Sequence, residues 1–448
     1  MHGEVPPSGA HPLTVVQKQS RLRPFLVALA LVGSACVVAT RVPATSVVLI
    51  TLDTTRADRL SPYGFRDAVM PALDRLAREG AVFDQATTVA PLTLPAHASL
   101  FTGLLPPRHG VRDNSSRSLS SDHVTLAEIL RARGFRTAAF VGSTVLDPDR
   151  GLDQGFEVYR GVSSSRQRRA DAVIDDAIRW LGGMSGAPFL LWAHLYDPHR
   201  PYEAPEPFAS RHDPYVAEIA YADSQIARLL AALDERRLLD HVVVVVVGDH
   251  GESLGDHRET DHGVFLYESV LRVPFILRAP GLSPRRVTSL VRLTDVMPTI
   301  LDLLGLPAPA IDGVSLINTM NGADPDLEAY AESLYPRHWG WAPLFALRSG
   351  RFKLIDAPRP ELYDLARDPF EERNIVDDRP VLAKALRSRL RTLWGNGHLP
   401  TAPVVAVDLR ARLAALGYVT GRFPASAERQ QLPDPKDCAG TFESGRCR

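Results

Sequence analysis

The sequence predicts an α/β fold, a three-layer sandwich in which helices cover both faces of a large mixed, mostly parallel β-sheet. Over the first two thirds of the chain, apolar runs rich in β-branched residues alternate with segments of helical spacing. Two runs, 46–52 and 241–251, are almost continuously apolar, as is typical of strands buried on both faces. The pattern changes after about residue 320, which predicts a small C-terminal α+β subdomain with an antiparallel sheet.

Each expected strand is a short apolar run, and each expected helix has apolar residues three or four positions apart. The strands are expected at 46–52, 135–142, 188–197, 241–251 and 273–281. The helices are expected at 70–80, 123–134, 168–183 and 214–238. In the C-terminal part the sequence predicts a hairpin over 344–355, a turn within 360–375 and a helix at 380–394.

The N-terminal segment predicts export. Residues 21–39 join a basic flank to an apolar run of about 15 residues, which is short for a membrane span and typical of a signal peptide. We therefore expect a periplasmic or cell-surface protein. Three routes remain open: lipidation at Cys36 as a lipoprotein, cleavage after Ala39 or Ala44, and retention as an N-terminal membrane anchor.

The expected domain boundaries follow from these patterns. They are a signal peptide or anchor at 1–45, the main α/β domain at 46–320, the C-terminal subdomain at 321–415 and an irregular tail at 416–448. Within the tail, Cys438 and Cys447 are close enough in sequence for a local disulfide, with two free thiols as the alternative. Three cysteines in the whole chain exclude a thiolate zinc site.

The charge balance bears on partners. Lys and Arg total 51 and Asp and Glu total 52, for a formal net charge of −1. No field of one sign is available to attract nucleic acid or an anionic membrane, so neither is expected as a partner. The composition does not indicate an oligomeric state.

Acidic residues stand at the ends of three predicted strands. Asp53, Asp197 and Asp249 each follow an apolar run directly or closely. The functional groups of such sheets collect at the carboxyl ends of the strands. His250 follows Asp249, and a carboxylate and an imidazole at adjacent positions can face one ion where Gly248 and Gly251 let the chain bend. The sequence therefore predicts a site at this edge of the sheet.

A hydroxyl precedes a short predicted helix in the segment Thr93-Leu-Pro-Ala-His-Ala-Ser-Leu-Phe-Thr-Gly103. Pro95 suits the first turn of a helix, so we expect Thr93 just outside its N-terminus, and we expect the helix to end at Gly103. Free backbone N–H groups and the helix dipole favour an anion at that position. A simple Thr N-cap without chemistry is the alternative.

This segment resembles the signature of the sulfatase family, in which Cys or Ser is followed by Pro, Ser, Arg and a small-residue run ending in Thr-Gly. Thr93 stands at the Cys or Ser that is oxidised to formylglycine, and His97 stands at the Arg. Threonine cannot give that aldehyde because its β-carbon already bears a methyl group. Threonine nucleophiles occur in relatives such as nucleotide pyrophosphatase/phosphodiesterases and phosphoethanolamine transferases. The resemblance therefore implies a sulfatase-like hydrolase of the alkaline phosphatase superfamily.

The resemblance also implies a metal site. Its first shell would be Asp53, Asp249, His250 and the Thr93 hydroxyl. Two carboxylates with an imidazole favour Mn²⁺ or Zn²⁺, while Ca²⁺ prefers oxygen ligands and a higher coordination number, although it is not excluded. A second metal has candidate ligands in Asp197, His199 and His262. His194 is a further candidate at this strand end, either for that metal or to orient His199.

Further catalytic residues are implied by the same resemblance. His199 and His262 stand where the family binds ester oxygens or protonates the leaving group, and Asn114 has the spacing from Thr93 of an oxyanion-holding asparagine. An ordinary turn asparagine is the alternative for Asn114. We count His97, at the position of the family's Arg, with these residues.

The expected function is hydrolysis of sulfate or phosphate/phosphonate esters with a metal-activated Thr93 nucleophile. The substrate would be a small-molecule, glycan or lipid ester. The family's Gly-Lys-Trp-His segment, whose lysine binds sulfate, is replaced by Phe-Val-Gly-Ser-Thr at 140–144, which makes a standard sulfate mechanism less favoured. A phosphoethanolamine-type transferase and a non-catalytic binding relative remain as alternatives.

Overall fold

The computed structural model of the protein describes residues 45–115, 118–162, 167–394 and 432–438. Its large sheet has the strand order β4-β3-β5-β1-β6-β7-β2-β8. The strands are β1 Ser46–Leu52, β2 Ala81–Thr87, β3 Arg136–Val141, β4 Val158–Arg160, β5 Phe189–Leu195, β6 Val242–Gly248, β7 Phe275–Arg278 and β8 Arg285–Arg292. Only β7 runs antiparallel to its neighbours, so the sheet is mixed and mostly parallel.

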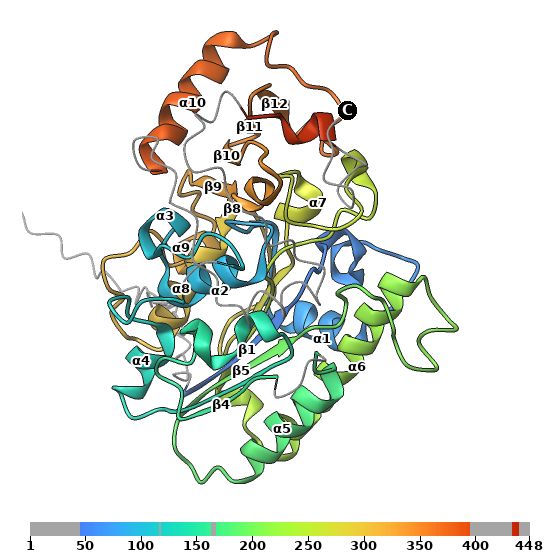
Figure 1. The fold of residues 1–448 in the computed structure, drawn as a ribbon. Helices are drawn as coiled ribbons and strands as arrows, with labels where there is room; N and C mark the ends of the chain where they lie inside the picture. The colour runs from blue at the N-terminus through green and yellow to red at the C-terminus, as the bar shows by residue number, and fades with distance from the viewer. Residues whose placement is uncertain (1–44, 116–117, 163–166, 395–431, 439–448) are drawn as a thin grey trace, which may run out of the picture. The chain divides into compact units, whose positions relative to one another are not determined.

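Two layers of helices cover this sheet (Figure 1). On one face lie α2 (Thr93–Thr102), α4 (Leu126–Arg131) and α8 (Val296–Leu303). On the other lie α1 (Pro71–Glu79), α5 (Ala170–Gly182) and α6 (Pro214–Glu235). Alternate residues of each strand supply the two apolar cores. The remaining described α-helices before the second sheet are short: α3 Pro106–His109, α7 Glu268–Leu271 and α9 Ile317–Met320.

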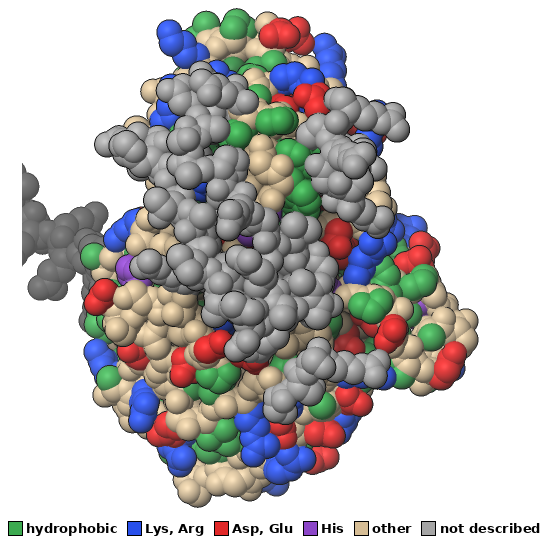
Figure 2. Space-filling model, in the orientation of Figure 1, with side chains coloured by type: hydrophobic (Ala, Val, Ile, Leu, Met, Phe, Trp, Pro, Cys, Tyr) green, Lys and Arg blue, Asp and Glu red, His purple; other side chains and the backbone are tan. Residues whose placement is uncertain are grey.

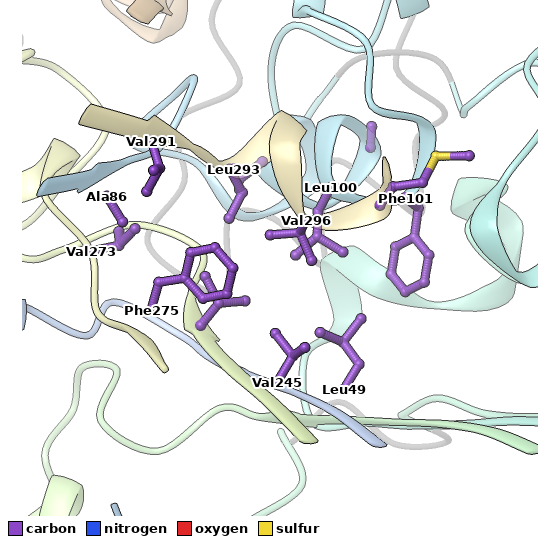
Figure 3. Close-up of a cluster of buried hydrophobic side chains, with 14 of the residues drawn as sticks. Leu49, Ala86, Leu100, Phe101, Val245, Val273, Phe275, Val291, Leu293 and Val296 are labelled. Carbon is purple, nitrogen blue, oxygen red and sulfur yellow. The ribbon is translucent and has the colours of Figure 1, made fainter. Parts of the chain in front are cut away.

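The core on the α2 face is a packed apolar layer between sheet and helices. In the close-up, Leu49 of β1 and Val245 of β6 lie beneath Leu100 and Phe101 of α2, with Val296 of α8 beside them (Figure 3). All of these side chains are almost fully buried. This layer fixes α2 above the central strands and thereby places its first residue near their carboxyl ends.

A second sheet with the order β12-β11-β10-β9 is antiparallel throughout. Its strands are β9 Glu328–Ser333, β10 Leu344–Ser349, β11 Phe352–Asp356 and β12 Glu361–Asp364, and α10 (Pro380–Leu393) packs on it. The Glu332 N–H donates to the Val89 carbonyl at 2.9 Å, which ties this sheet to the segment before α2. The predicted fold class is therefore confirmed, including the antiparallel second sheet.

The differences from expectation lie mainly at the edge of the large sheet. Neither β2 nor β8 was expected, because their sequences mix charged and apolar residues as an edge region does. The domain boundaries stay predictions. No helix among the described residues is long and apolar enough to cross a membrane, and the apolar run at 25–39 lies outside them.

Two further expectations concern the surface and the tail. On the face in Figure 2, side chains of both charge signs are intermixed. Cys438 is disulfide-bonded, while Cys36 and Cys447 lie outside the described residues, so the pairing of Cys438 with Cys447 stays a prediction.

Candidate active site

The candidate site lies where the two central strands end. Asp53 follows β1 directly, and Asp249 and His250 follow β6. The Asp249 N–H donates to the Leu52 carbonyl at 3.2 Å, which keeps the two strand ends together. The bend after β6 requires glycine at 251, because a Cβ there would lie 2.1 Å from the Ser269 carbonyl oxygen.

Asp53, Asp249 and His250 form the only group of three or more candidate metal ligands found among the residues described. Their ligand atoms lie within 4.8 Å of one another, and all three side chains are fully buried. Both carboxylate oxygens of Asp53 and Oδ2 of Asp249 have no hydrogen-bond partner among the described residues. Buried carboxylates without partners are costly unless a cation compensates them. The three residues therefore fit a divalent metal ion.

The electrostatics of this group point the same way. Burial and the nearby Asp53 charge raise the pKa of Asp249 well above its usual range. Burial opposes ionisation of Asp53 too, but the contact with His194 and the other nearby histidines hold its pKa below the usual range. Burial lowers the pKa of His250, so its imidazole is neutral.

The ring of His250 presents one nitrogen to this group. Its Nδ1 lies 3.0 Å from the Gly251 carbonyl, to which only an N–H can donate, so Nε2 carries the lone pair. Nε2 lies 3.6 Å from Asp53 Oδ1, 3.6 Å from Asp249 Oδ2 and 3.2 Å from Thr93 Oγ1. A lone pair directed at two carboxylates and a hydroxyl has the arrangement of a metal ligand.

Thr93 is the first residue of α2 and not, as expected, the residue before it. Leu92, with φ −146° and ψ 135°, occupies the N-cap position. Pro95 stands third in the helix and so lies in its first turn as expected, where its missing N–H is harmless. The helix ends at Gly103 as expected. The Thr93 hydroxyl caps nothing and instead donates to His250 Nε2.

Asn114 takes over the capping of α2. Its Oδ1 accepts the Leu94 N–H at 2.9 Å, and its backbone carbonyl accepts Arg150 Nη2 at 2.7 Å. Because the amide oxygen is committed to the helix, Nδ2 is the group left over, and it has no hydrogen-bond partner among the described residues. Asn114 is 1% exposed, so this is a buried N–H donor near Thr93.

The loop that carries Asn114 is held from the second sheet. Arg112 forms a buried ion pair with Glu332 of β9, with Nε 2.7 Å from Oε1. On the other side, Asp113 Oδ1 lies 3.3 Å from His338 Nε2, in the short helix Tyr335–Trp339. Arg112 and Asp113, which directly precede Asn114, are thus both held by residues of the C-terminal part of the chain.

His97 lies one helical turn after Thr93 within α2. Its Nδ1 donates to the Thr93 carbonyl at 2.8 Å, and its Nε2 lies 3.0 Å from Thr51 Oγ1. Nδ1 is 3.7 Å from Asp249 Oδ2. Burial lowers the pKa of His97 to about 3, so the ring is neutral. Its hydrogen bonds go to the backbone of Thr93 and not to the hydroxyl.

His199 and His262 face each other at 3.3 Å between their Nε2 atoms. Their Nδ1 atoms lie 2.7 Å from the Arg200 carbonyl and 3.0 Å from the Pro91 carbonyl, respectively. The His262 ring also packs on His250, with 4.4 Å between ring centroids. The structure therefore brings both predicted histidines to the metal-ligand group.

Asp197 has a different partner. Its Oδ2 accepts the Ala170 N–H at the start of α5, at 2.7 Å. In the described part of the chain it belongs to no three-ligand group with His199 and His262. The second metal stays a prediction without a third ligand in place.

Thr51 is the residue that the sequence did not reveal. A threonine inside an apolar β-branched run indicates only strand propensity, yet its hydroxyl contacts three ring nitrogens. The available signal was strand alternation, which puts Thr51 on the same face as Asp53, two residues later.

Comparisons with known proteins identify the family of the chain. A family model described as Sulfatase matches residues 45–306, and one described as N-sulphoglucosamine sulphohydrolase, C-terminal, matches residues 255–394. The chain is similar to an ulvan-active sulfatase of Formosa agariphila, with 26% identity over 396 residues, 74% of this chain and 77% of the relative. It is also similar to a choline-sulfatase of Rhizobium meliloti, with 27% identity over 414 residues, 71% of this chain and 80% of the relative.

Solved structures share the fold. A phosphonate monoester hydrolase of Agrobacterium radiobacter superimposes with a TM-score of 0.67 and 22% identity, covering 78% of this chain and 95% of that one. A protein solved in complex with D-glucosamine-2-N,6-O-disulfate as its substrate gives a TM-score of 0.68 and 20% identity, covering 78% of this chain and 98% of that one.

Proposed function

The chain belongs to the sulfatase family and is an ester hydrolase, and we propose that it cleaves phosphate or phosphonate esters, in preference to sulfate esters, with Thr93 as the nucleophile. The observation that carries this proposal is the position of the Thr93 hydroxyl. It lies 3.2 Å from His250 Nε2, beside three carboxylate oxygens that have no hydrogen-bond partner among the described residues. A hydroxyl held in a buried anionic group has little structural use, but it suits a nucleophile.

Asp53, Asp249, His250 and Thr93 would hold the divalent cation. The mixed oxygen and imidazole donors favour Mn²⁺ or Zn²⁺ over Ca²⁺. Such an ion, when bound, lowers the pKa of the nucleophile and neutralises charge on the ester group.

The residues of the chain have distinct roles in this proposal. In the first step the Thr93 oxygen forms a bond to phosphorus while the bond to the leaving oxygen breaks. Asn114 Nδ2 donates to the charge that develops on a non-bridging oxygen. The Thr93 hydroxyl loses its proton in this step, and the pair of His199 and His262, whose Nε2 atoms face each other, takes up one proton and delivers one to the leaving oxygen, so that the protons balance. In the second step water attacks the Thr93 ester, which releases the acid and restores the hydroxyl.

Two considerations favour phosphorus over sulfur as the atom attacked. The methyl group on the β-carbon of Thr93 prevents formation of the formylglycine that serves the family's sulfate esters. The structural neighbours include a phosphonate monoester hydrolase as well as a protein described as a 2-O GAG sulfatase. The curated relatives act on ulvan and on choline sulfate by their names, so a small-molecule or glycan ester is the proposed substrate class here.

A substrate panel tests the proposal. Purified protein is assayed with an aryl sulfate, a phosphate monoester, a phosphodiester and a phosphonate ester, each with added Mn²⁺ or Zn²⁺. We expect turnover of the phosphodiester or phosphonate to exceed that of the sulfate. Thr93→Ser, which keeps a hydroxyl, should retain activity, and Thr93→Val, which keeps the shape, should abolish it. Turnover of the sulfate alone would contradict the proposed nucleophile.

Export is the proposed location. Residues 1–44 lie outside the described residues, so the proposal rests on the basic and apolar pattern of 21–39. Cell fractionation of the full chain and of a form lacking residues 1–44 tests it: only the full chain should reach the periplasm or the cell surface. Replacement of Cys36 by Ser separates lipidation from the other routes.

A further inference from the structure

The hydroxyl of Thr51 is an unusual centre of contacts next to the candidate metal site. It is fully buried and lies 3.0 Å from each of three ring nitrogens: Trp192 Nε1, His97 Nε2 and His194 Nδ1. Thr51 and His194 stand opposite each other in the register of the adjacent strands β1 and β5. Trp192, two residues before His194 on β5, lies on the same face.

The hydrogen-bonding capacity of one hydroxyl matches these three partners. A hydroxyl accepts two hydrogen bonds and donates one. Trp192 Nε1 can only donate. His97 Nδ1 donates to the Thr93 carbonyl, which leaves Nε2 to accept the Thr51 proton. His194 Nδ1 then donates to Thr51, and the hydroxyl is saturated.

The two histidines extend this centre in different directions. His194 Nε2 lies 3.3 Å from Asp53 Oδ2 without a hydrogen bond between them among the described residues, so the position of the ring limits where this proposed metal ligand can lie by direct contact. His97 holds the carbonyl of Thr93 and thereby the first turn of α2. Asp53 and Thr93 come from different elements, and through these rings both are connected to the Thr51 oxygen.

His194 itself lies beside the metal-ligand group without belonging to it. The three residues of the group have ligand atoms within 4.8 Å of one another, and His194 is not among them. Its effect on a bound ion would therefore act through Asp53. Partners of this kind orient the ligating side chain, and their loss typically weakens metal affinity by about 10- to 100-fold.

We propose that Thr51 is a positioning residue that fixes the positions of Asp53 and Thr93 relative to each other for metal binding. This inference rests on the proposed function, because it presupposes that Asp53 and Thr93 share one ion. It assigns a role to a residue that touches neither the metal nor the substrate. Its effect reaches the site only through the rings of His194 and His97.

The test measures binding of Co²⁺ alone to the full-length protein, by visible absorption, so activity is not the readout. Thr51→Val is nearly isosteric but removes the hydroxyl, and we expect Co²⁺ affinity to fall about 10-fold or more. Thr51→Ser keeps the hydroxyl and should restore affinity to within about threefold of the parent protein. The Co²⁺ spectrum should change in Thr51→Val and not in Thr51→Ser.

Two controls separate positioning from simple loss of packing. Trp192→Phe removes the contact that does not reach the site, and Thr137→Val removes a buried hydroxyl on β3 that donates to the Gly155 carbonyl at 2.7 Å. Both should lower stability but leave Co²⁺ affinity within about threefold. His194→Asn keeps a donor toward Thr51 and loses the contact with Asp53, so it should weaken Co²⁺ binding as Thr51→Val does, and it decides the question if Thr51→Val does not fold.

The outcomes distinguish this inference from the proposed function. If Thr51→Val, or His194→Asn in its place, binds Co²⁺ as tightly as the parent, the positioning role is wrong and the metal site stands. Equal losses in Trp192→Phe and Thr51→Val would also overturn it, as a general packing effect. If the parent protein binds no Co²⁺ at all, the proposed function fails and this inference with it.

Discussion

Two buried polar clusters in this molecule differ in how their charges are matched. In the first, between α7 and the second sheet, Lys353 Nζ lies 2.9 Å from Glu268 Oε1 and 2.6 Å from Glu371 Oε1. Arg348 adds a second cation 3.3 Å from Glu268. Two acids therefore meet two bases. Although burial opposes ionisation of Glu268, Lys353 and Arg348 hold its pKa below the usual range.

The second cluster, at the candidate metal site, has two acidic side chains but, in the part of the chain that the structure describes, no Lys or Arg to balance their charge. Asp53 and Asp249 lie at the ends of β1 and β6 with a neutral His250 between them. Among the described residues, their ion-pair contacts are with histidines and not with Lys or Arg. Asp53 and Asp249 are fully buried and the Glu268 side chain is only 12% exposed, so the main difference between the clusters lies in the partners of the carboxylates. A buried cluster whose charges balance is structural, whereas one that lacks a cation is built to receive one. The unsatisfied oxygens, more than the burial, mark the functional site.

Replacement of Asp249 should have the largest effect of the changes considered. Asp249→Asn keeps the shape and removes one of the two charges that would attract the cation. We expect kcat/KM to fall roughly 10³-fold, because charge stabilisation worth several kcal/mol is lost. Metal content after dialysis against limiting Mn²⁺ should fall in parallel. The matched control is Asp223→Asn on α6, a buried acid that accepts the Ala72 and Leu73 N–H groups and should leave metal content unchanged. Equal metal content in both variants would contradict the assignment.

The balanced cluster should respond to mutation in the opposite manner. Lys353→Met leaves Glu268 and Glu371 buried without their shared cation, which should lower the free energy of unfolding by about 3–5 kcal/mol. Urea denaturation measures this loss. Metal affinity of the folded variant should stay within about threefold of the parent, because Gly251 N–H keeps its bond to the Val270 carbonyl of α7 at 2.8 Å. If Lys353→Met lost metal affinity but kept its stability, the assignment of a structural role to the Lys353 cluster would be wrong.

The location of the site at the carboxyl ends of the strands could be predicted from the sequence, because it depends only on where the strands end. Asp53, Asp249 and His250 follow runs so apolar that few other structures fit them, and parallel strands bring their carboxyl ends together. The position of Thr93 was wrong by one residue, since helix boundaries depend on φ and ψ that a single proline does not fix. The resemblance to the sulfatases, and not the pattern, led to His199, His262 and Asn114.

What the sequence could not predict depends on packing between distant segments. Thr51 contacts residues 46, 141 and 143 positions away, and those contacts exist only once β1, β5 and α2 are assembled. Strand β8 at the edge of the large sheet and its neighbour β2 were missed for a related reason. Charged side chains in them, such as Arg286 of β8 paired with Asp84 of β2, are accommodated by the neighbouring strand and do not show a strand periodicity in the sequence. Asp197 was assigned to the site by its strand-end position, but its carboxylate caps α5.

A smaller effect is expected at the buried donor of the site. Asn114→Ala removes the unpaired Nδ2 together with the cap of α2, and loss of one oxyanion donor costs about 10²- to 10³-fold in kcat. KM should change far less, because the donor acts on charge that develops in the transition state. Asn374→Ala is the control, since Asn374 Oδ1 also accepts backbone N–H groups, those of Leu362 and Val376. Both variants lose an amide oxygen that accepts backbone N–H groups, and only Asn114→Ala also loses the donor at the site. An equal drop in kcat for both would therefore contradict a role for the Asn114 donor.

The smallest expected effect concerns the stability contribution of Glu218, a buried acid that lies outside both clusters. Burial and the nearby Asp197 raise the pKa of Glu218, on α6, to about 8. Because this pKa is raised above the unfolded value, the stability that Glu218 contributes is complete below about pH 4.5 and is lost as the pH rises toward 8. Glu218→Gln keeps the oxygen that accepts the Glu203 N–H at 2.7 Å and cannot ionise. The melting temperature of this variant should therefore exceed that of the parent by a margin that grows between pH 4.5 and 8 and then stays constant. If the difference in melting temperature does not change over this range, Glu218 is ionised in the folded protein. A buried acid would then be tolerated here without a proton or a compensating cation.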